Sequence, residues 1–432
     1  MPNRRSRNKL PILSLIVLLI LAGLFAWRWG LPLLRALTVS PSEQYASQGD
    51  AFLADGRLPE AVLSYRQALE ADPENSTARS ALARAYAGQG RLRLAAQYGY
   101  TGQTNAGDAL PFLWINADTA VPPTGAAVTA DRIVVAYEDG TLKVLDRRSG
   151  AQVMQIQLPA AVTSAPAVQD DMAWVGAQDG SIYAIRLADG STAWTFPSGG
   201  PIFAAPVFAD GTLYCASSSG SLFALNAQTG VQKWKFTTRG ALHAPPAVSG
   251  GRAVFGSHDA RIYAVDAATG APAWQDGILT GGAVESQPAL VENRVIAGSG
   301  DGRVYALALD SGGQFWRVST PDAVYAAPLV AGETVYIASS GSSLSAISLL
   351  SGEKLWQASL PGPLRNPPAL AGDALYQIVD GDAGLYRVDT ASGSVTRLGS
   401  TGDWTAAGPW ISGETLYLLG KDGAVLAYNL PD

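Results

Sequence analysis

The side chains that most often carry out catalysis are scarce in this chain of 432 residues. It has two histidines, His243 and His258, and one cysteine, Cys215. A serine nucleophile needs a histidine base, and a metal site needs clustered His, Cys, Asp or Glu. Neither histidine stands at ligand spacing from such residues, and Cys215 follows Tyr214 in a strand-like run that predicts a buried apolar role. The sequence therefore predicts no catalytic residue and no metal ligand.

Two further kinds of chemistry are considered and set aside. The acidic run VDGDAG (Val379–Gly384) could supply calcium with oxygen ligands, but SGDG and AQDG fill the same place elsewhere, which indicates a turn. The glycines precede strands, whereas a nucleotide-binding loop leads into a helix. Beyond residue 36 the chain has 24 basic residues against 36 acidic ones, so we expect no nucleic-acid partner.

A repeat of about 40 residues organises most of the chain. A tryptophan marks it at Trp114, Trp194, Trp234, Trp274, Trp316 and Trp356, with Met154 in the slot after the first. The unit Ala205–Phe236 contains four short apolar runs separated by Gly-containing turns, which is typical of a four-stranded antiparallel sheet. Residues 113–432 hold about eight units, and a ring of small sheets is a β-propeller.

Two details of the repeat predict how the ring closes and packs. A glycine such as Gly230 stands four residues before the tryptophan slot, where a tight turn with positive φ leads into the fourth strand. The tryptophan that follows is expected on the outer strand, wedged between adjacent blades. The last unit, Pro409–Leu430, offers only three strands, so we expect Phe112–Ile115 to supply its fourth.

One position varies while the rest of the repeat hardly changes. It lies three residues before a recurring proline, where the chain crosses from one blade to the next, at Thr163, Phe203, His243, Glu285, Tyr325, Arg365 and Ala406. Such crossings lie around one mouth of a propeller's channel. Varied His, Glu, Tyr, Arg and Phe side chains are suited to contacting a partner, so this is the candidate binding site; the alternative is drift at a tolerant loop position.

The repeat resembles the pyrroloquinoline-quinone (PQQ)-type propeller repeat. RAVFGSHDARIYAVDAATGAPAW (Arg252–Trp274) and VIAGSGDGRVYALALDSGGQFW (Val295–Trp316) match it closely. The resemblance covers residues 110–432 and implies an all-β, eight-bladed propeller. It is shared by quinoprotein dehydrogenases and by the non-catalytic BamB-type factors of outer-membrane β-barrel assembly.

The two branches imply different functions. Quinoprotein dehydrogenases place an adjacent disulfide over PQQ and a calcium ion beneath it, and they carry long insertions. One cysteine and units of nearly constant length do not match that pattern, so we expect no enzyme and no cofactor. The resemblance then implies a scaffold that binds envelope or membrane proteins, with a PQQ-dependent quinoprotein dehydrogenase-like enzyme or a cofactor or ligand sensor as the alternative.

Two segments precede the propeller. Residues 1–36 contain a basic stretch with Arg4 and Lys9 and then eighteen uncharged residues, Leu10–Trp27. These predict one transmembrane helix, about residues 10–29, with a cytoplasmic N-terminus and an extracytoplasmic (periplasmic or cell-surface) propeller. A cleaved signal peptide is the alternative. Residues 42–103 resemble two tetratricopeptide (TPR) repeats; Gly49 and Ala83 would allow close helix packing, and Pro73 would end the second helix.

Overall fold

The computed structural model describes residues 40–88, 95, 98, 112–116, 121–380, 384–400, 408–421 and 423–430. The chain divides into two compact units, one up to Ala85 and one from Tyr86 onward. The basic segment and predicted transmembrane helix (about residues 10–29) of residues 1–36 lie outside the described residues. None of the helices in the ranges above is long and apolar enough to span a membrane.

The first unit contains helices α3 (Pro41–Ala54), α4 (Leu58–Ala71) and α5 (Ser76–Gly88). Ser40 begins α3 with a capping box that it shares with Glu43. Gly49 lets α4 approach, because a Cβ there would lie 2.6 Å from the Tyr65 ring. The Tyr65 hydroxyl donates to Asp50 over 2.7 Å. The three helices fit the TPR prediction, and most of the second repeat's second helix falls outside the described residues.

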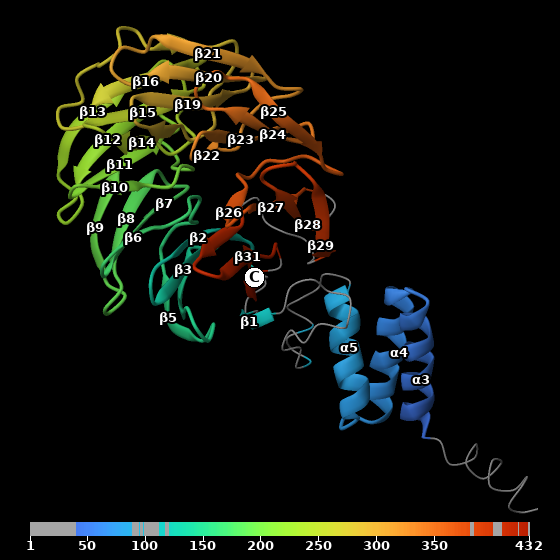
Figure 1. The fold of residues 1–432 in the computed structure, drawn as a ribbon. Coiled ribbons are helices and arrows are strands. Elements are labelled where there is room, and N and C mark those ends of the chain that lie inside the picture. Colours follow the sequence, from blue (N-terminus) through green and yellow to red (C-terminus); the bar gives the residue numbers. More distant parts are fainter. Residues whose placement is uncertain are drawn as a thin grey trace, which may run out of the picture. The chain divides into compact units, whose positions relative to one another are not determined.

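The second unit is a ring of eight four-stranded antiparallel sheets (Figure 1). Blade 1 contains β2 (Pro123–Val128), β3 (Arg132–Tyr137), β4 (Thr141–Asp146) and β5 (Gln152–Gln157), and blade 2 contains β6 (Ala167–Gln169), β7 (Met172–Gly176), β8 (Ser181–Arg186) and β9 (Thr192–Pro197). Blade 3 contains β10 (Val207–Ala209), β11 (Thr212–Ser217), β12 (Ser221–Asn226) and β13 (Gln232–Thr237), and blade 4 contains β14 (Ala247–Ser249), β15 (Arg252–Ser257), β16 (Arg261–Asp266) and β17 (Ile278–Leu279). Blade 5 contains β18 (Ala289–Val291), β19 (Arg294–Ser299), β20 (Arg303–Ala308) and β21 (Gln314–Ser319). Blade 6 contains β22 (Leu329–Ala331), β23 (Thr334–Ala338), β24 (Ser343–Ser348) and β25 (Lys354–Ser359), and blade 7 contains β26 (Ala369–Ala371), β27 (Ala374–Val379), β28 (Gly384–Asp389) and β29 (Val395–Ser400). In each blade the first strand lies nearest the centre of the ring and the fourth lies outside (Figure 1).

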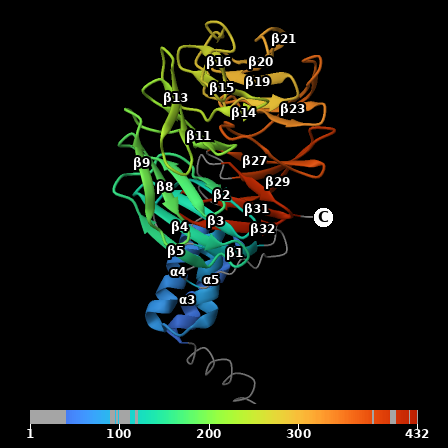
Figure 2. The same ribbon diagram turned by 90° about the vertical axis from the view of Figure 1, so that its left-hand side faces the viewer.

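Blade 8 joins the two ends of the ring. Its strands are β30 (Trp410–Ser412), β31 (Thr415–Leu419), β32 (Val425–Asn429) and, from the start of the propeller, β1 (Phe112–Asn116). The sheet order is β1-β32-β31-β30, and Trp114 lies opposite Ala427. Figure 2 shows β1 beside β32 and β31. The predicted closure by an N-terminal strand is confirmed, and the outer edge of β32 is thereby paired.

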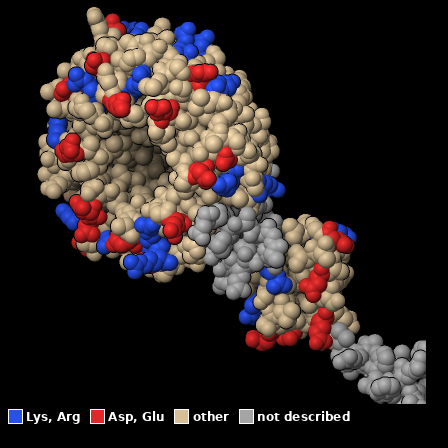
Figure 3. All heavy atoms as spheres, in the orientation of Figure 1, with Lys and Arg blue, Asp and Glu red and all other residues tan. Residues whose placement is uncertain are grey.

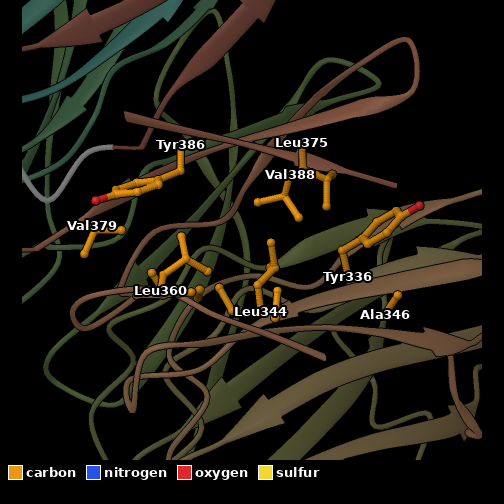
Figure 4. Close-up of a cluster of buried hydrophobic side chains, with 12 residues drawn as sticks. Tyr336, Leu344, Ala346, Leu360, Leu375, Val379, Tyr386 and Val388 are labelled. Atoms are coloured by element: carbon orange, nitrogen blue, oxygen red, sulfur yellow. The ribbon is translucent and has the colours of Figure 1, made fainter. Parts of the chain in front are cut away.

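The cores of the ring lie between neighbouring blades. Between blades 6 and 7, Tyr336 and Leu344 face Leu375 and Val388, and all four are buried (Figure 4). Each sheet has apolar residues on both faces because it is covered by a blade on either side. This explains why β11 and β12 are buried along nearly their whole length.

A tryptophan–glycine contact recurs at six of the eight blade interfaces. Trp234 donates its indole N–H to the carbonyl of Ala267 in the next blade over 3.0 Å. Its ring packs on Gly270, where φ is +72° and a Cβ would lie 2.7 Å from the ring. The contacts pair Trp114, Trp194, Trp234, Trp274, Trp316 and Trp356 with Gly150, Gly230, Gly270, Gly312, Gly352 and Gly393. The predicted wedging and the positive φ are both confirmed.

Blade 4 departs from the predicted pattern in its outer strand. Trp274 was expected within that strand, but it lies in an irregular segment before the two-residue β17. Pro272 has no N–H to donate, and Asp276 and Gly277 both have positive φ, so regular pairing with β16 is interrupted. The indole still reaches the next blade and donates to the carbonyl of Leu309 over 3.1 Å.

Candidate functional site

The varied positions lie where two kinds of loop meet. Each crossing into a blade lies beside the turn between that blade's second and third strands. In blade 4, the backbone N–H of His258 donates to the carbonyl of Ala241 over 3.0 Å. The equivalent donors in six other blades are Glu138, Gln178, Ser218, Gly300, Ser340 and Asp380. Since the acceptor stands two residues before the varied position, this bond fixes the crossing and leaves the varied side chain free to differ.

We call Thr163, Phe203, His243, Glu285, Tyr325 and Arg365 the mouth residues; Ala406 lies outside the described residues. Each is followed within a few residues by an innermost strand, and these strands surround the opening of the ring. The wall of that opening is mostly uncharged (Figure 3). Phe203 is 43% exposed and Tyr325 is 39% exposed. Exposed aromatic rings beside charged groups form a surface suited to protein contacts.

Three mouth residues and one turn residue form a continuous arc across blades 3 to 5. The Phe203 ring meets the His243 ring edge to face, with centroids 5.2 Å apart. The His243 and His258 rings follow at 4.3 Å. His258 Nε2 then lies 3.2 Å from Oε1 of Glu285. The two atoms are close but not aligned for a hydrogen bond, so His258 Nε2 is buried without a hydrogen-bond partner.

The other mouth residues have separate contacts. Arg365 is largely exposed, and its Nε lies 3.3 Å from Oδ2 of Asp380 in the turn of the same blade. Tyr325 lies beside Gly300, where a Cβ would come 3.7 Å from the tyrosine ring. Thr163 faces the next blade, because its hydroxyl donates to the carbonyl of Ile202 over 2.5 Å.

Sequence reasoning missed the turn residues of this face, His258 and Asp380 among them. The two histidines, which show no ligand spacing along the sequence, lie beside each other in the structure. His243 and His258 occupy different loops of one blade, and Glu285 comes from the crossing into the next blade. The turn residue whose N–H bonds to the crossing also differs from blade to blade, for example His258, Gly300 and Asp380. Comparing this position across the repeats would have found a second varied position.

The electrostatics of the arc favour a neutral imidazole at His243. Burial lowers the pKa of His243, and the neighbouring His258 lowers it further, while Glu285 acts in the opposite direction. Asp259, next to His258, uses one carboxylate oxygen, Oδ2, for contacts outside the arc, while its Oδ1 is buried without a hydrogen-bond partner. It accepts from the Tyr263 hydroxyl over 2.7 Å and from the backbone N–H of Arg239 over 3.1 Å.

The model of the family described as outer membrane protein assembly factor BamB matches residues 112–204, 196–397 and 340–432. The chain belongs to the BamB family. A TPR-repeat model matches residues 49–90 as well. The predicted PQQ-type, BamB-like propeller with an N-terminal TPR segment is therefore confirmed.

Two solved structures share this fold. BamB from Moraxella catarrhalis is 20% identical, with a TM-score of 0.64 over 74% of this chain and all of that one. The computationally designed protein Ika8 is 18% identical, with a TM-score of 0.64 over 72% of this chain and 98% of that one. No curated protein matches the chain. Because a designed protein shares the fold, the ring alone does not define a function.

The quinoprotein alternative was tested against the residues of this ring. Cys215 is fully buried in β11 and cannot form an adjacent disulfide. No three His, Cys, Asp or Glu side chains are gathered as metal ligands within the described ranges. Asp380 of the VDGDAG run contacts Arg365, while residues 381–383 lie outside the description. The single, buried cysteine does not match the adjacent disulfide of the quinoprotein pattern.

The helical unit has a groove of its own, between α3 and the turn that leads into α5. It is lined by Ser40, Glu43, Ala46, Ser47, Asp50, Asp72, Glu74, Asn75, Ser76 and Thr77. Four of these residues are acidic and none is basic. The Asn75 side chain caps α5 by accepting from the N–H of Ala78 over 2.9 Å. Part of the polar lining therefore serves the helices themselves.

Proposed function

We propose that the protein is a non-catalytic scaffold whose propeller binds other envelope or membrane proteins through the mouth residues. The observation that carries this proposal is the contrast between the repeated frame and the exposed or half-buried, chemically varied side chains on it. A frame held by backbone hydrogen bonds tolerates any side chain at the varied position, so these positions are available for recognition. Membership in the BamB family supports a role in outer-membrane protein assembly.

The same proposal includes a location. Residues 1–36 anchor the chain by one transmembrane helix, with the N-terminus in the cytoplasm and both folded units on the extracytoplasmic side. The basic residues before the apolar stretch support this orientation. Mass spectrometry of the protein extracted from membranes should recover the Arg4–Lys9 segment. A mature N-terminus after residue 26 would instead indicate a cleaved signal peptide and a secreted protein.

Partner binding is tested by replacing exposed mouth residues one at a time. Phe203→Ala, Glu285→Ala, Tyr325→Ala and Arg365→Ala should each change the free energy of unfolding by less than about 0.5 kcal/mol, as exposed positions do. At least one should weaken partner capture by about 1–2 kcal/mol, because desolvated aromatic residues and Arg dominate protein interfaces. The measurements are the melting temperature and crosslinked capture from membranes, followed by affinity for the captured partner.

Phe315 provides a matched control for Phe203. It is 49% exposed, but it lies on the outer strand β21 and contacts Arg294 rather than the mouth. Phe315→Ala should leave partner capture unchanged. If all four mouth variants bind normally, or if Phe315→Ala weakens binding as much as Phe203→Ala does, the mouth is not the docking surface.

The enzymatic alternative has its own test. Purified protein incubated with PQQ and Ca²⁺ should gain neither the absorbance of bound cofactor nor dye-linked alcohol oxidation. Either signal would overturn the non-catalytic assignment.

A further inference from the structure

The arc at blades 3 to 5 contains an unusual convergence of possible metal ligands. His243 and His258 are the only histidines in the chain, yet their ring centroids lie 4.3 Å apart. The crossing and the turn that carry them are joined by the His258–Ala241 backbone hydrogen bond. Glu285, from the next crossing, adds a carboxylate on the other side of His258.

The contact between His258 and Glu285 has the spacing of two ligands rather than of a hydrogen bond. Their Nε2 and Oε1 atoms are 3.2 Å apart, without hydrogen-bond geometry, and Nε2 is buried with no other partner. Zinc binds His nitrogen and carboxylate oxygen at about 2.0–2.2 Å in tetrahedral geometry. Two such ligands lie about 3.3 Å from each other, so a shared ion would satisfy the buried nitrogen.

We propose that His243, His258 and Glu285 bind one divalent transition-metal ion of the Zn²⁺ class at the mouth of the ring. Two imidazoles and one carboxylate form a donor set that suits Zn²⁺, Co²⁺, Ni²⁺ or Cu²⁺ better than Mg²⁺ or Ca²⁺. As placed in the structure, no three His, Cys, Asp or Glu side chains of the described residues lie close enough together to hold a metal ion, these three included. Binding requires the partly exposed His243 ring to rotate toward the other two.

The donor set also leaves room for a further ligand. Three protein ligands leave a fourth position open to water or to a ligand from another molecule. The bound ion would connect the crossings into blades 4 and 5 through the turn that carries His258. This inference does not depend on the proposed scaffold function.

The chain gives an unusually clean background for the test. Its only other strong Zn²⁺ ligand, Cys215, is fully buried, and burial raises the pKa of its thiol. Full-length protein is purified in detergent with an affinity tag that contains no histidine. Titration with ZnCl₂ in a calorimeter should show one ion per chain, and Co²⁺ should give the visible absorption of a site with nitrogen ligands.

Variants decide between this site and nonspecific binding. His243→Gln, His258→Gln and Glu285→Gln should each weaken Zn²⁺ binding at least about tenfold, with unchanged melting temperature in EDTA. Arg365→Gln, at the equivalent position of blade 7, should bind Zn²⁺ as the parent protein does. Absence of a one-to-one complex, or Zn²⁺ affinity unaffected by His243→Gln or by His258→Gln, would overturn the proposal.

Discussion

The interfaces between blades and the mouth of the channel follow opposite rules within the same repeat. At the interfaces one solution recurs, in which an indole packs on a glycine of the next blade and donates to a nearby carbonyl, as Trp234 does with Gly270 and Ala267. At the mouth the same backbone hydrogen bond recurs in blades 2 to 7, while the side chain two residues after its acceptor differs from blade to blade, as at His243, Glu285 and Arg365.

The difference shows which positions of the ring are fixed by packing. A tryptophan at an interface contacts two blades, so its replacement disturbs the packing of both. Its ring also needs a glycine in the next blade to pack against. A mouth residue lies two residues after the carbonyl that holds its crossing in place, so its side chain is not part of that frame. We therefore expect substitutions at the interfaces to lower the stability of the ring and to affect partner binding only through unfolding. Substitutions at the mouth should weaken partner binding with little effect on stability.

Removal of β1 should have the largest effect. Deletion of residues 1–105 keeps the strand that completes blade 8 and should leave a folded, soluble ring. Deletion of residues 1–118 also removes Trp114 and exposes the edge of β32, so it should cause aggregation. Size-exclusion chromatography and circular dichroism distinguish the two outcomes. Identical behaviour of both truncations would mean that closure through β1 is not needed for folding.

Trp234→Ala should come next. The ring is 7% exposed, and its loss leaves a cavity between blades 3 and 4, for which we expect about 3–5 kcal/mol of destabilisation. Trp234→Phe keeps an aromatic ring over Gly270 but loses the bond to Ala267, so it should be milder. Urea unfolding gives both values. If Trp234→Ala lowers the free energy of unfolding by less than about 1 kcal/mol, the interface contact is no more important for stability than the mouth residues, and the contrast fails.

Two glycines with nearly the same φ separate backbone strain from the tryptophan contact. Gly270 has φ of +72° and faces Trp234, whereas Gly211 has φ of +70° and nothing within 4 Å of an added Cβ. Alanine at either position incurs about 1–2 kcal/mol of left-handed strain. Gly270→Ala should lose a further 1–3 kcal/mol or so, because its methyl group displaces the indole. Equal destabilisation of the two variants would show that the glycine serves the turn alone.

Much of the ring could be predicted because its signals are local and repeated. The spacing of Trp194, Trp234 and Trp316 fixes the blade length, and the missing fourth strand after Pro409 predicts closure by Phe112–Ile115. The irregular outer strand around Trp274 was not predicted, because the tryptophan kept its spacing while Pro272 and Gly277 changed the strand around it. The glycines also accept the packed indole ring of the preceding blade. This contact joins two units, so the sequence of a single repeat does not reveal it.

The mouth was harder to predict, because its contacts join loops from different repeats. The variability of Phe203, His243 and Glu285 was visible in the sequence, but their connection through His258 was not. Spacing along the chain says nothing of it, since the residues come from two crossings and one turn. Whether this face binds a partner remains a prediction.

The smallest expected effect is a pH dependence of stability that arises at the mouth. His243 and His258 are the only histidines, so they are the only side chains with ordinary pKa values near 6.5. Because burial lowers the pKa of His243, the unfolded chain takes up a proton at higher pH than the folded chain. The contribution of neutral His243 is therefore complete above its ordinary pKa and is lost as pH falls toward its lowered value. Stability should begin to decrease as pH falls through about 6.5, the ordinary histidine pKa, with no further loss from this group once both states are protonated.

His243→Gln is the variant that assigns this slope, because glutamine keeps polar groups at the position and does not titrate. Urea unfolding at several pH values, in EDTA so that no metal contributes, should give a weaker decrease for His243→Gln than for the parent protein. Thr163→Ala, at the equivalent crossing of blade 2, should retain the full slope. Glu285→Gln should steepen it, since the carboxylate opposes the lowering of the His243 pKa. A slope that persists unchanged in His243→Gln would assign it to His258 or to groups outside the mouth.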